Sequence, residues 1–167
     1  MLISEAMNAS LNGQVGEELG ASNHYINIAG YFDEENLPIL SAFFFRQSNE
    51  ERLHALRFVR YVLDAGGKAA IPAIEAGPSE FESAEAAAAA ALEWELAVTE
   101  MINKLMDQAI KENDHTTQQF LRWFVDEQLE EVSTMEELLG VVQRAGEGGL
   151  LFVEQYLANQ PAPSAPA

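Results

Sequence analysis

Long stretches of the chain repeat apolar residues every three or four positions, the spacing that places them on one face of an α-helix. Turn signals are sparse and gather in a few places, and β-branched alternation is rare. The pattern therefore predicts an all-α chain with four long helices. These run from about 4 to the acidic stretch 33–36, from 38 to the glycines at 66–67, from a serine at 79 or 83 to the break at 113–114, and from there to about 145.

Signals at the helix ends support these limits. Ser4 is suited to cap the first helix, and Pro38 suits the first turn of the second. Glycines follow the fourth helix, after which residues 150–157 fit a shorter, fifth amphipathic helix. The last segment, 161–167, is rich in proline and poor in large apolar groups, so we expect a disordered tail behind a single domain of residues 1–160.

The connection between the second and third helices is long enough to decide the topology. A helix of about 28 residues is roughly 42 Å long. An extended segment of about 14 residues reaches roughly 46 Å. This connection can therefore run the whole length of the bundle, which makes the second and third helices parallel. The expected architecture is a four-helix bundle with one long crossover and a short fifth helix.

The composition limits the kinds of site and partner that the chain can have. The chain of 167 residues has no cysteine, which excludes disulfides, iron–sulfur clusters and thiolate zinc sites. No apolar run is long enough to cross a bilayer, and the first residues lack a basic stretch followed by an apolar one, so a cytoplasmic location is expected. The net charge of -18 opposes binding to nucleic acid or to a membrane surface and favours cations as partners.

Each long helix carries a carboxylate in the middle of its apolar stripe. On the second helix, Glu51 and His54 lie between phenylalanines that must face the core. The corresponding acids on the other helices are Glu18, Glu95 and Glu131. Four ionised carboxylates buried at one level would be costly without a positive partner. Oxygen ligands with one imidazole suit iron or manganese, so the pattern predicts a metal centre.

The spacing Glu51-x-x-His54 places both side chains on one helix face, where they can reach one metal pair. This short motif is common by chance, and only its combination with the three other core acids makes it informative. The fourth helix offers Gln128 and no second histidine, so one metal should be held more weakly. Tyr25, two turns from Glu18, either hydrogen-bonds a ligand, donates an electron, or simply packs in the core.

Three further acids, Glu50, Glu127 and Glu130, sit beside this set, rotated toward the flank of the bundle. From the residues alone they are either a third cation site or ordinary surface acids. The histidines outside the stripes, His24 and His115, are interpreted as surface groups.

Together these residues resemble the set found in bacterial non-haem ferritins, and the resemblance covers nearly the whole chain. It implies an iron-storage protein that oxidises Fe(II) with O2 or H2O2 and assembles into a cage of 24 subunits. It also implies a ferroxidase centre with Glu51 as the bridge, Tyr25 beside it, and a third iron site. The implied centre is Glu18, Glu51, His54, Glu95, Gln128 and Glu131, and the third site is Glu50, Glu127 and Glu130.

Related folds offer other interpretations. Bacterioferritins resemble this chain but place a methionine haem ligand directly after the glutamate that Glu51 matches, where this chain has Arg52, so no haem is expected. A ferritin-like di-iron or manganese oxidase or peroxidase without mineral storage is the main alternative. A metal-free acidic helical scaffold is a second. A miniature ferritin is disfavoured because its iron site lies between subunits.

Overall fold

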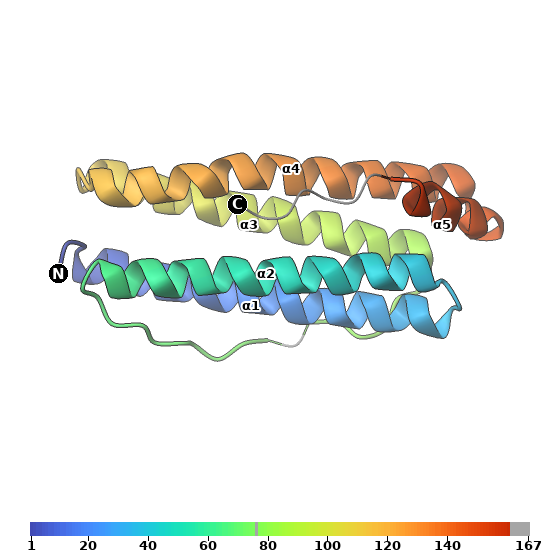
Figure 1. Cartoon of the computed structure of the whole chain (residues 1–167), viewed down its shortest axis with the longest axis horizontal. Coiled ribbons are helices and arrows are strands. Elements are labelled where there is room, and N and C mark those ends of the chain that lie inside the picture. The colour runs from blue at the N-terminus through green and yellow to red at the C-terminus, as the bar shows by residue number, and fades with distance from the viewer. Residues whose placement is uncertain (76, 161–167) are drawn as a thin grey trace.

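The computed structural model describes residues 1–75 and 77–160, so the tail expected at 161–167 lies outside the described residues. Four long helices and a short one make up this part of the chain, and no strand occurs in it, which confirms the all-α prediction (Figure 1). The elements are α1 Glu5–Glu34, α2 Pro38–Asp64, α3 Ala84–Lys111, α4 His115–Ala145, the 3-10 turn η1 Glu147–Gly149 and α5 Leu150–Ala158.

Local capping explains where the long helices begin. The Ser4 hydroxyl accepts a hydrogen bond from the Met7 amide at 2.9 Å, as its position predicts. Of the two serines considered for α3, Ser83 is the cap. Asp114 caps α4 by accepting from the Thr117 amide at 2.9 Å. The predicted limits lie within about three residues of the observed ones, whereas η1 was not expected.

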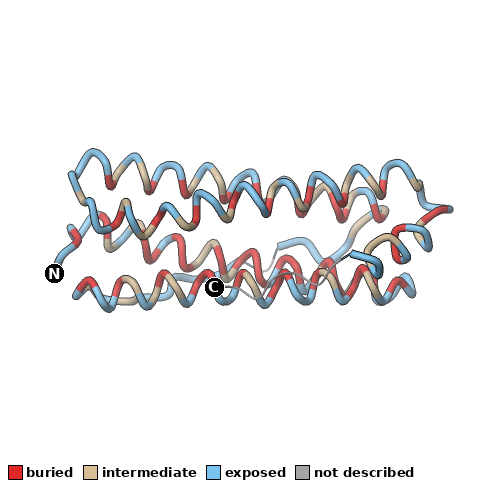
Figure 2. Tube along the Cα trace, turned by 45° about the horizontal axis from the view of Figure 1, so that its top comes forward, coloured by how far each residue is buried: buried red, intermediate tan, exposed pale blue. Residues whose placement is uncertain are grey.

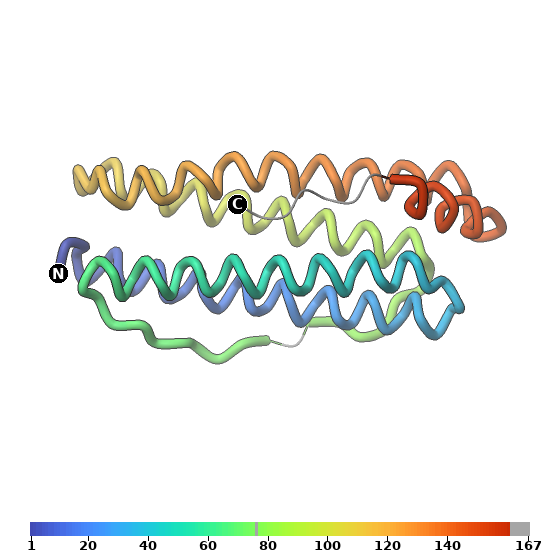
Figure 3. Tube along the Cα trace, in the orientation of Figure 1, coloured from blue at the N-terminus to red at the C-terminus, as the bar shows by residue number. Residues whose placement is uncertain are grey.

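The long helices form two antiparallel hairpins, α1 with α2 and α3 with α4 (Figure 1). Residues 65–75 and 77–83 run back along the bundle, so α2 and α3 are parallel, as the length argument predicts (Figure 3). Side chains of α1 hold this crossover in place: the Asn12 amide group donates to the Lys68 carbonyl at 2.8 Å, and Asn27 donates to the Pro78 carbonyl at 3.0 Å. The four-helix bundle with one long crossover is therefore confirmed.

The core consists of two apolar clusters separated along the bundle axis. Buried residues form a stripe on the inner face of each long helix (Figure 2). One cluster contains Phe32, Phe44 and Met135 and lies toward α5, and the other contains Leu11 and Phe58. The carboxylates in the middle of the apolar stripes lie in a layer between these clusters. Apolar packing therefore fixes the helices on both sides of this layer.

The short helix α5 packs against the end of the bundle and caps the N-terminus of α2. Leu37, the residue before Pro38, offers no side-chain cap to α2. Instead Glu154 of α5, which is buried, accepts hydrogen bonds from the amides of Ile39 at 3.0 Å and Leu40 at 2.6 Å. A carboxylate at a helix N-terminus is favourable because the first amides there have no partner within the helix. Among the described residues, no helix is both long and apolar enough to span a membrane.

Candidate metal centre

The four stripe acids meet between the two apolar clusters, one from each long helix. Glu18, Glu51, Glu95 and Glu131 are 1 %, 1 %, 1 % and 5 % exposed. Their ligand atoms, with those of His54, fall into two sets within which all atoms lie within 4.8 Å of one another. One set is Glu18, Glu51 and His54, and the other is Glu51, Glu95 and Glu131. The two sets share Glu51, so they describe two adjacent cation positions with a common carboxylate.

Several atoms at this centre are buried without a hydrogen-bond partner. They are Glu18 Oε2, Glu51 Oε1 and His54 Nδ1. His54 Nδ1 lies 3.3 Å from Glu51 Oε2 and 4.0 Å from Glu18 Oε2. A buried polar atom without a partner is costly, and three at one point in the described core call for a specific explanation. A divalent cation bound by these oxygen and nitrogen atoms would satisfy them together.

Burial raises the pKa of all four carboxyls above the ordinary 4.5. For Glu131, burial and the repulsion of Glu95 raise the pKa to about 8. For Glu51, the pKa stands well above the ordinary value because burial is joined by repulsion from Glu95 and Glu18. Without a cation, the centre therefore holds protons near neutral pH. A bound cation would replace those protons, because metal ligands must be deprotonated.

The pKa of the His54 imidazole is also raised, but by its acidic neighbours and not by burial. Burial alone would lower the pKa of His54, but its contacts with Glu127, Glu18 and Glu131 outweigh burial and leave the pKa above 6.5. His54 Nε2 lies 3.8 Å from Glu127 Oε1, on the side away from Nδ1. Glu127 can therefore orient the ring while Nδ1 faces the candidate ligands, an arrangement common for metal-binding histidines.

Two of the predicted site residues, Tyr25 and Gln128, contact Glu95. The Tyr25 hydroxyl donates a hydrogen bond to Glu95 Oε1, and the ring of Tyr25 is fully buried. The Gln128 amide donates to Glu95 Oε2 at 3.0 Å and to Thr99 Oγ1 at 3.2 Å. Of the roles considered for Tyr25, hydrogen bonding to a candidate ligand and packing are both observed, and electron donation stays a prediction.

Two further glutamines contact the centre and were not among the predicted site residues. The Gln14 amide donates to Glu18 Oε1 at 2.9 Å, and the Gln47 amide donates to Glu131 Oε2 at 2.8 Å. Each lies one helical turn before the stripe acid of its own helix, Gln14 before Glu18 and Gln47 before Glu51. This spacing of four residues is the sequence feature from which both glutamines could have been identified.

The three flanking acids line a groove of about 860 Å³ between α2 and α4, closed at one end by α5. Glu127 approaches the centre and forms a third set within 4.8 Å with His54 and Glu131. Glu50 is half-buried and Glu130 is exposed, and neither joins such a set in the described part of the chain. The structure thus places all three at one groove, and their binding of a third cation stays a prediction.

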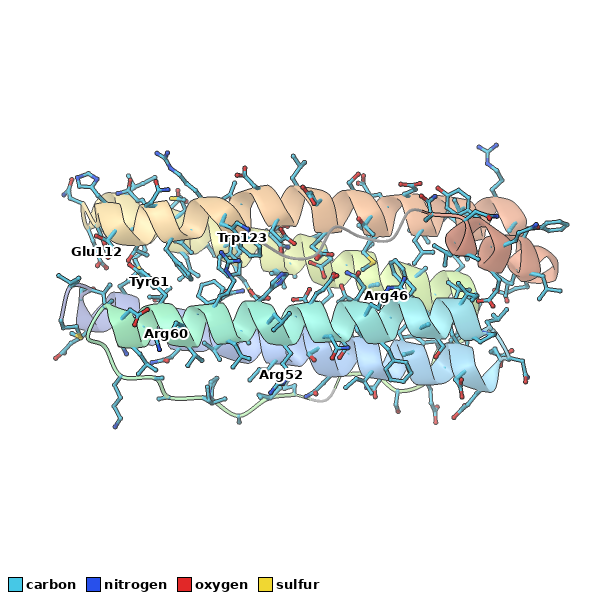
Figure 4. The ribbon with its side chains drawn as sticks, in the orientation of Figure 1. Arg46, Arg52, Arg60, Tyr61, Glu112 and Trp123 are labelled. Carbon is cyan, nitrogen blue, oxygen red and sulfur yellow. The ribbon has the colours of Figure 1, made fainter. Side chains whose placement is uncertain are left out.

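Aromatic side chains border this groove. Trp123 of α4 points into the space between α4 and α2, and Arg46 extends from the α2 side (Figure 4). The Trp123 ring packs edge-on to His54 at 5.4 Å and lies 3.7 Å from the Arg57 guanidinium. Arg52, the residue after Glu51, points away from the groove (Figure 4) and is exposed.

The interpretation of His24 as a surface group is wrong. His24 is 2 % exposed and stacks on Trp94, with ring centres 4.9 Å apart. The crossover covers this face of α1, and a side chain built on Gly77 would lie 3.2 Å from His24 Nδ1. The periodicity of α1 alone gives no information about a covering segment far along the chain. His115, by contrast, is exposed as predicted.

Comparison with known proteins agrees with this geometry. Residues 8–145 match the model of the ferritin-like domain. The chain is 40 % identical over 152 residues to the ferritin BfrB of Mycolicibacterium smegmatis, which covers 91 % of this chain and 83 % of that protein. It is 31 % identical to a bacterial non-heme ferritin of Bacteroides fragilis, over 95 % and 100 % of the two chains. Its fold superimposes on an open-pore ferritin from Archaeoglobus fulgidus with a TM-score of 0.92 and 34 % identity, covering 96 % and 99 % of the chains.

Proposed function

The chain belongs to the ferritin family, and on that premise we propose that it oxidises Fe(II) at the centre between its four long helices and stores the ferric product in a cage of 24 copies. The observation that carries the proposal is the pair of ligand sets that share Glu51. Two cations held a few ångströms apart by one common carboxylate can react together with one molecule of oxidant.

The proposed roles follow from these contacts. Glu51 bridges the two iron substrates because it belongs to both sets. Glu18 and His54 hold one iron, and Glu95 and Glu131 hold the other. Gln128 and Tyr25 support the centre through their hydrogen bonds to Glu95. Carboxylates suit this reaction because hard oxygen ligands favour the ferric state.

The proposed reaction transfers one electron from each of two Fe(II) ions. Dioxygen accepts both electrons with two protons and leaves as hydrogen peroxide, or hydrogen peroxide accepts them with two protons and gives two waters. The buried carboxyls release protons when the cations bind, because their ligand oxygens must be deprotonated. Glu50, Glu127 and Glu130 form the proposed third iron site, in the groove next to the centre.

A second candidate function rests on the same groove. Its volume of about 860 Å³ beside His54 and Trp123 is large enough for a small organic substrate. A ferritin-like di-iron or manganese oxidase or peroxidase would use such a space, and it would not store a mineral. We rank this function second because the groove is lined by five glutamates and three arginines, a balance that favours cations over a neutral organic molecule.

The mass of the assembled particle, measured together with Fe(II) oxidation in air, tests the proposal. We expect a particle near 24 subunits that oxidises and retains many irons per subunit. Glu51→Ala should abolish the fast oxidation, whereas Glu136→Ala, at an exposed acid of the same charge on α4, should not change it. A monomer or dimer that binds about two metals and accumulates no iron would favour the second function, and a protein that takes up no iron would refute both.

A further inference from the structure

Three glutamines from different helices each donate one amide hydrogen bond to a different carboxylate of the centre. Gln14 of α1 donates to Glu18 at 2.9 Å, Gln47 of α2 donates to Glu131 at 2.8 Å, and Gln128 of α4 donates to Glu95 at 3.0 Å. Among the described hydrogen bonds, none brings an amide to Glu51. The carboxylates proposed as terminal ligands are thus held by amides, and the carboxylate proposed as the bridge is not.

The hydrogen bond from Gln14 engages only one of the two carboxylate oxygens of Glu18. Oε1 accepts the amide hydrogen bond and faces Gln14. Oε2 has no partner and lies 4.0 Å from His54 Nδ1, which is also without a partner. Both atoms belong to residues of one candidate ligand set, Glu18, Glu51 and His54. The hydrogen bond from Gln14 to Oε1 favours the orientation of the carboxylate that leaves Oε2 near His54.

We infer that Gln14 is a positioning residue of the centre: its amide keeps Glu18 a one-oxygen, terminal ligand of the iron that His54 shares. This inference rests on the proposed function, because it assumes that the two ligand sets bind metal. It assigns Gln47 the same task toward Glu131 at the other iron. Hydrogen bonds to ligating carboxylates commonly tune metal affinity in this way.

Two features of the site explain why an amide suits this position. Gln14 is 4 % exposed beside a layer that already holds four carboxyls, so a neutral donor adds no further buried charge. On its other side, Gln14 borders a hollow of about 310 Å³ between α1 and α3. The hydrogen bond to Glu18 orients the Gln14 amide and, through it, the Glu18 carboxylate.

Cobalt(II) titration of the metal-free, assembled protein without air tests the inference, because the visible absorption of cobalt reports its ligand geometry without any turnover. We expect the parent to bind two cobalt ions at the centre, in addition to the one expected at Glu50, Glu127 and Glu130. Gln14→Leu, which removes the donor at similar volume, should weaken one of them by about 10- to 100-fold and change its absorption bands. The same ion should be weakened in His54→Ala, whereas Gln47→Leu should weaken the other ion.

Matched controls separate this role from general damage. Gln143→Leu makes the same substitution at an exposed glutamine that contacts Glu85, and it should leave both cobalt ions unchanged. Gln14→Met provides a second variant without a donor should the leucine prevent assembly, which particle mass reports. Two cobalt ions bound with parental affinity and spectrum by either Gln14 variant would overturn the inference and leave the proposed function standing. No cobalt bound by the parent would overturn both.

Discussion

Replacing Glu131 with glutamine should stabilise the metal-free protein near neutral pH. The folded state raises the pKa of Glu131 from 4.5 to about 8, through burial and the repulsion of Glu95. Folding therefore binds a proton in this range, and stability that is complete below about pH 4.5 is lost as the pH rises toward 8. Each pH unit costs about 1.4 kcal/mol, so at about pH 7.5 the cost reaches about 4 kcal/mol. Glutamine avoids this cost because it is neutral.

Thermal unfolding of the chelated proteins measures this effect. For a chain of this size, about 4 kcal/mol corresponds to a rise in Tm of about 10 °C, which is a ceiling because neighbouring carboxyls share the same protons. The gain should shrink to nothing near pH 4.5. Glu136→Gln, at an exposed position of α4, should shift Tm little at either pH. An equal gain at both pH values, or a loss at pH 7.5, would refute the reasoning.

Bound metal should narrow the difference in stability between Glu131→Gln and the parent. A redox-inert ion such as zinc(II), bound at about 100 times its Kd, stabilises a folded protein by about 2.7 kcal/mol per site. The parent keeps the carboxylate of Glu131 as a ligand and should gain this amount, whereas Glu131→Gln should gain less because an amide oxygen carries no charge. A variant that gains as much as the parent would show that Glu131 does not bind metal.

Three further predictions concern other parts of the chain. Gly13→Ala should raise the free energy of unfolding by up to about 1 kcal/mol, because nothing lies within 4 Å of the added carbon. Gly16→Ala should lower the free energy of unfolding, because the added carbon would lie 2.5 Å from Pro72. The Tm values of the two variants test this difference. Glu154→Ala removes the cap of α2 and should cost about 1 kcal/mol, seen as faster hydrogen exchange in the first turn of α2. Glu130→Gln should leave oxidation of the first two irons unchanged and slow later turnovers, measured by stopped flow.

The helices were predictable because the signals that begin them are local. The cap at Ser4 and the break before Asp114 each lie within a few residues of the helix they start, and the structure places the helix starts there. The choice between Ser79 and Ser83 could not be made from the sequence, since both serines are followed by residues that favour a helix. In the structure Ser83 is the cap, because its hydroxyl accepts a hydrogen bond from the Ala86 amide at 3.0 Å.

The candidate centre was predictable for a different reason. A carboxylate such as Glu95 is unusual among the apolar residues of one helix face, and this pattern can be recognised from the sequence alone. The spacing of Gln14 four residues before Glu18 places it near the centre, but a neutral amide is common on a helix, and the oxygen of Glu18 that it contacts is known only from the structure. His24 was misplaced because burial there comes from the crossover around Gly77, more than 50 residues away in sequence.

The position of the acid layer explains how the bundle tolerates it. Apolar clusters lie on both sides of the layer, so the helices are fixed there whatever the charge state between them. The carboxyls can therefore lose protons and gain cations without a change of fold, and the free energy stored as raised pKa values becomes available to bind metal. A better-paired layer would make the metal-free protein more stable, but it would bind iron more weakly. On this argument, the instability of the metal-free centre and its proposed affinity for iron have the same origin.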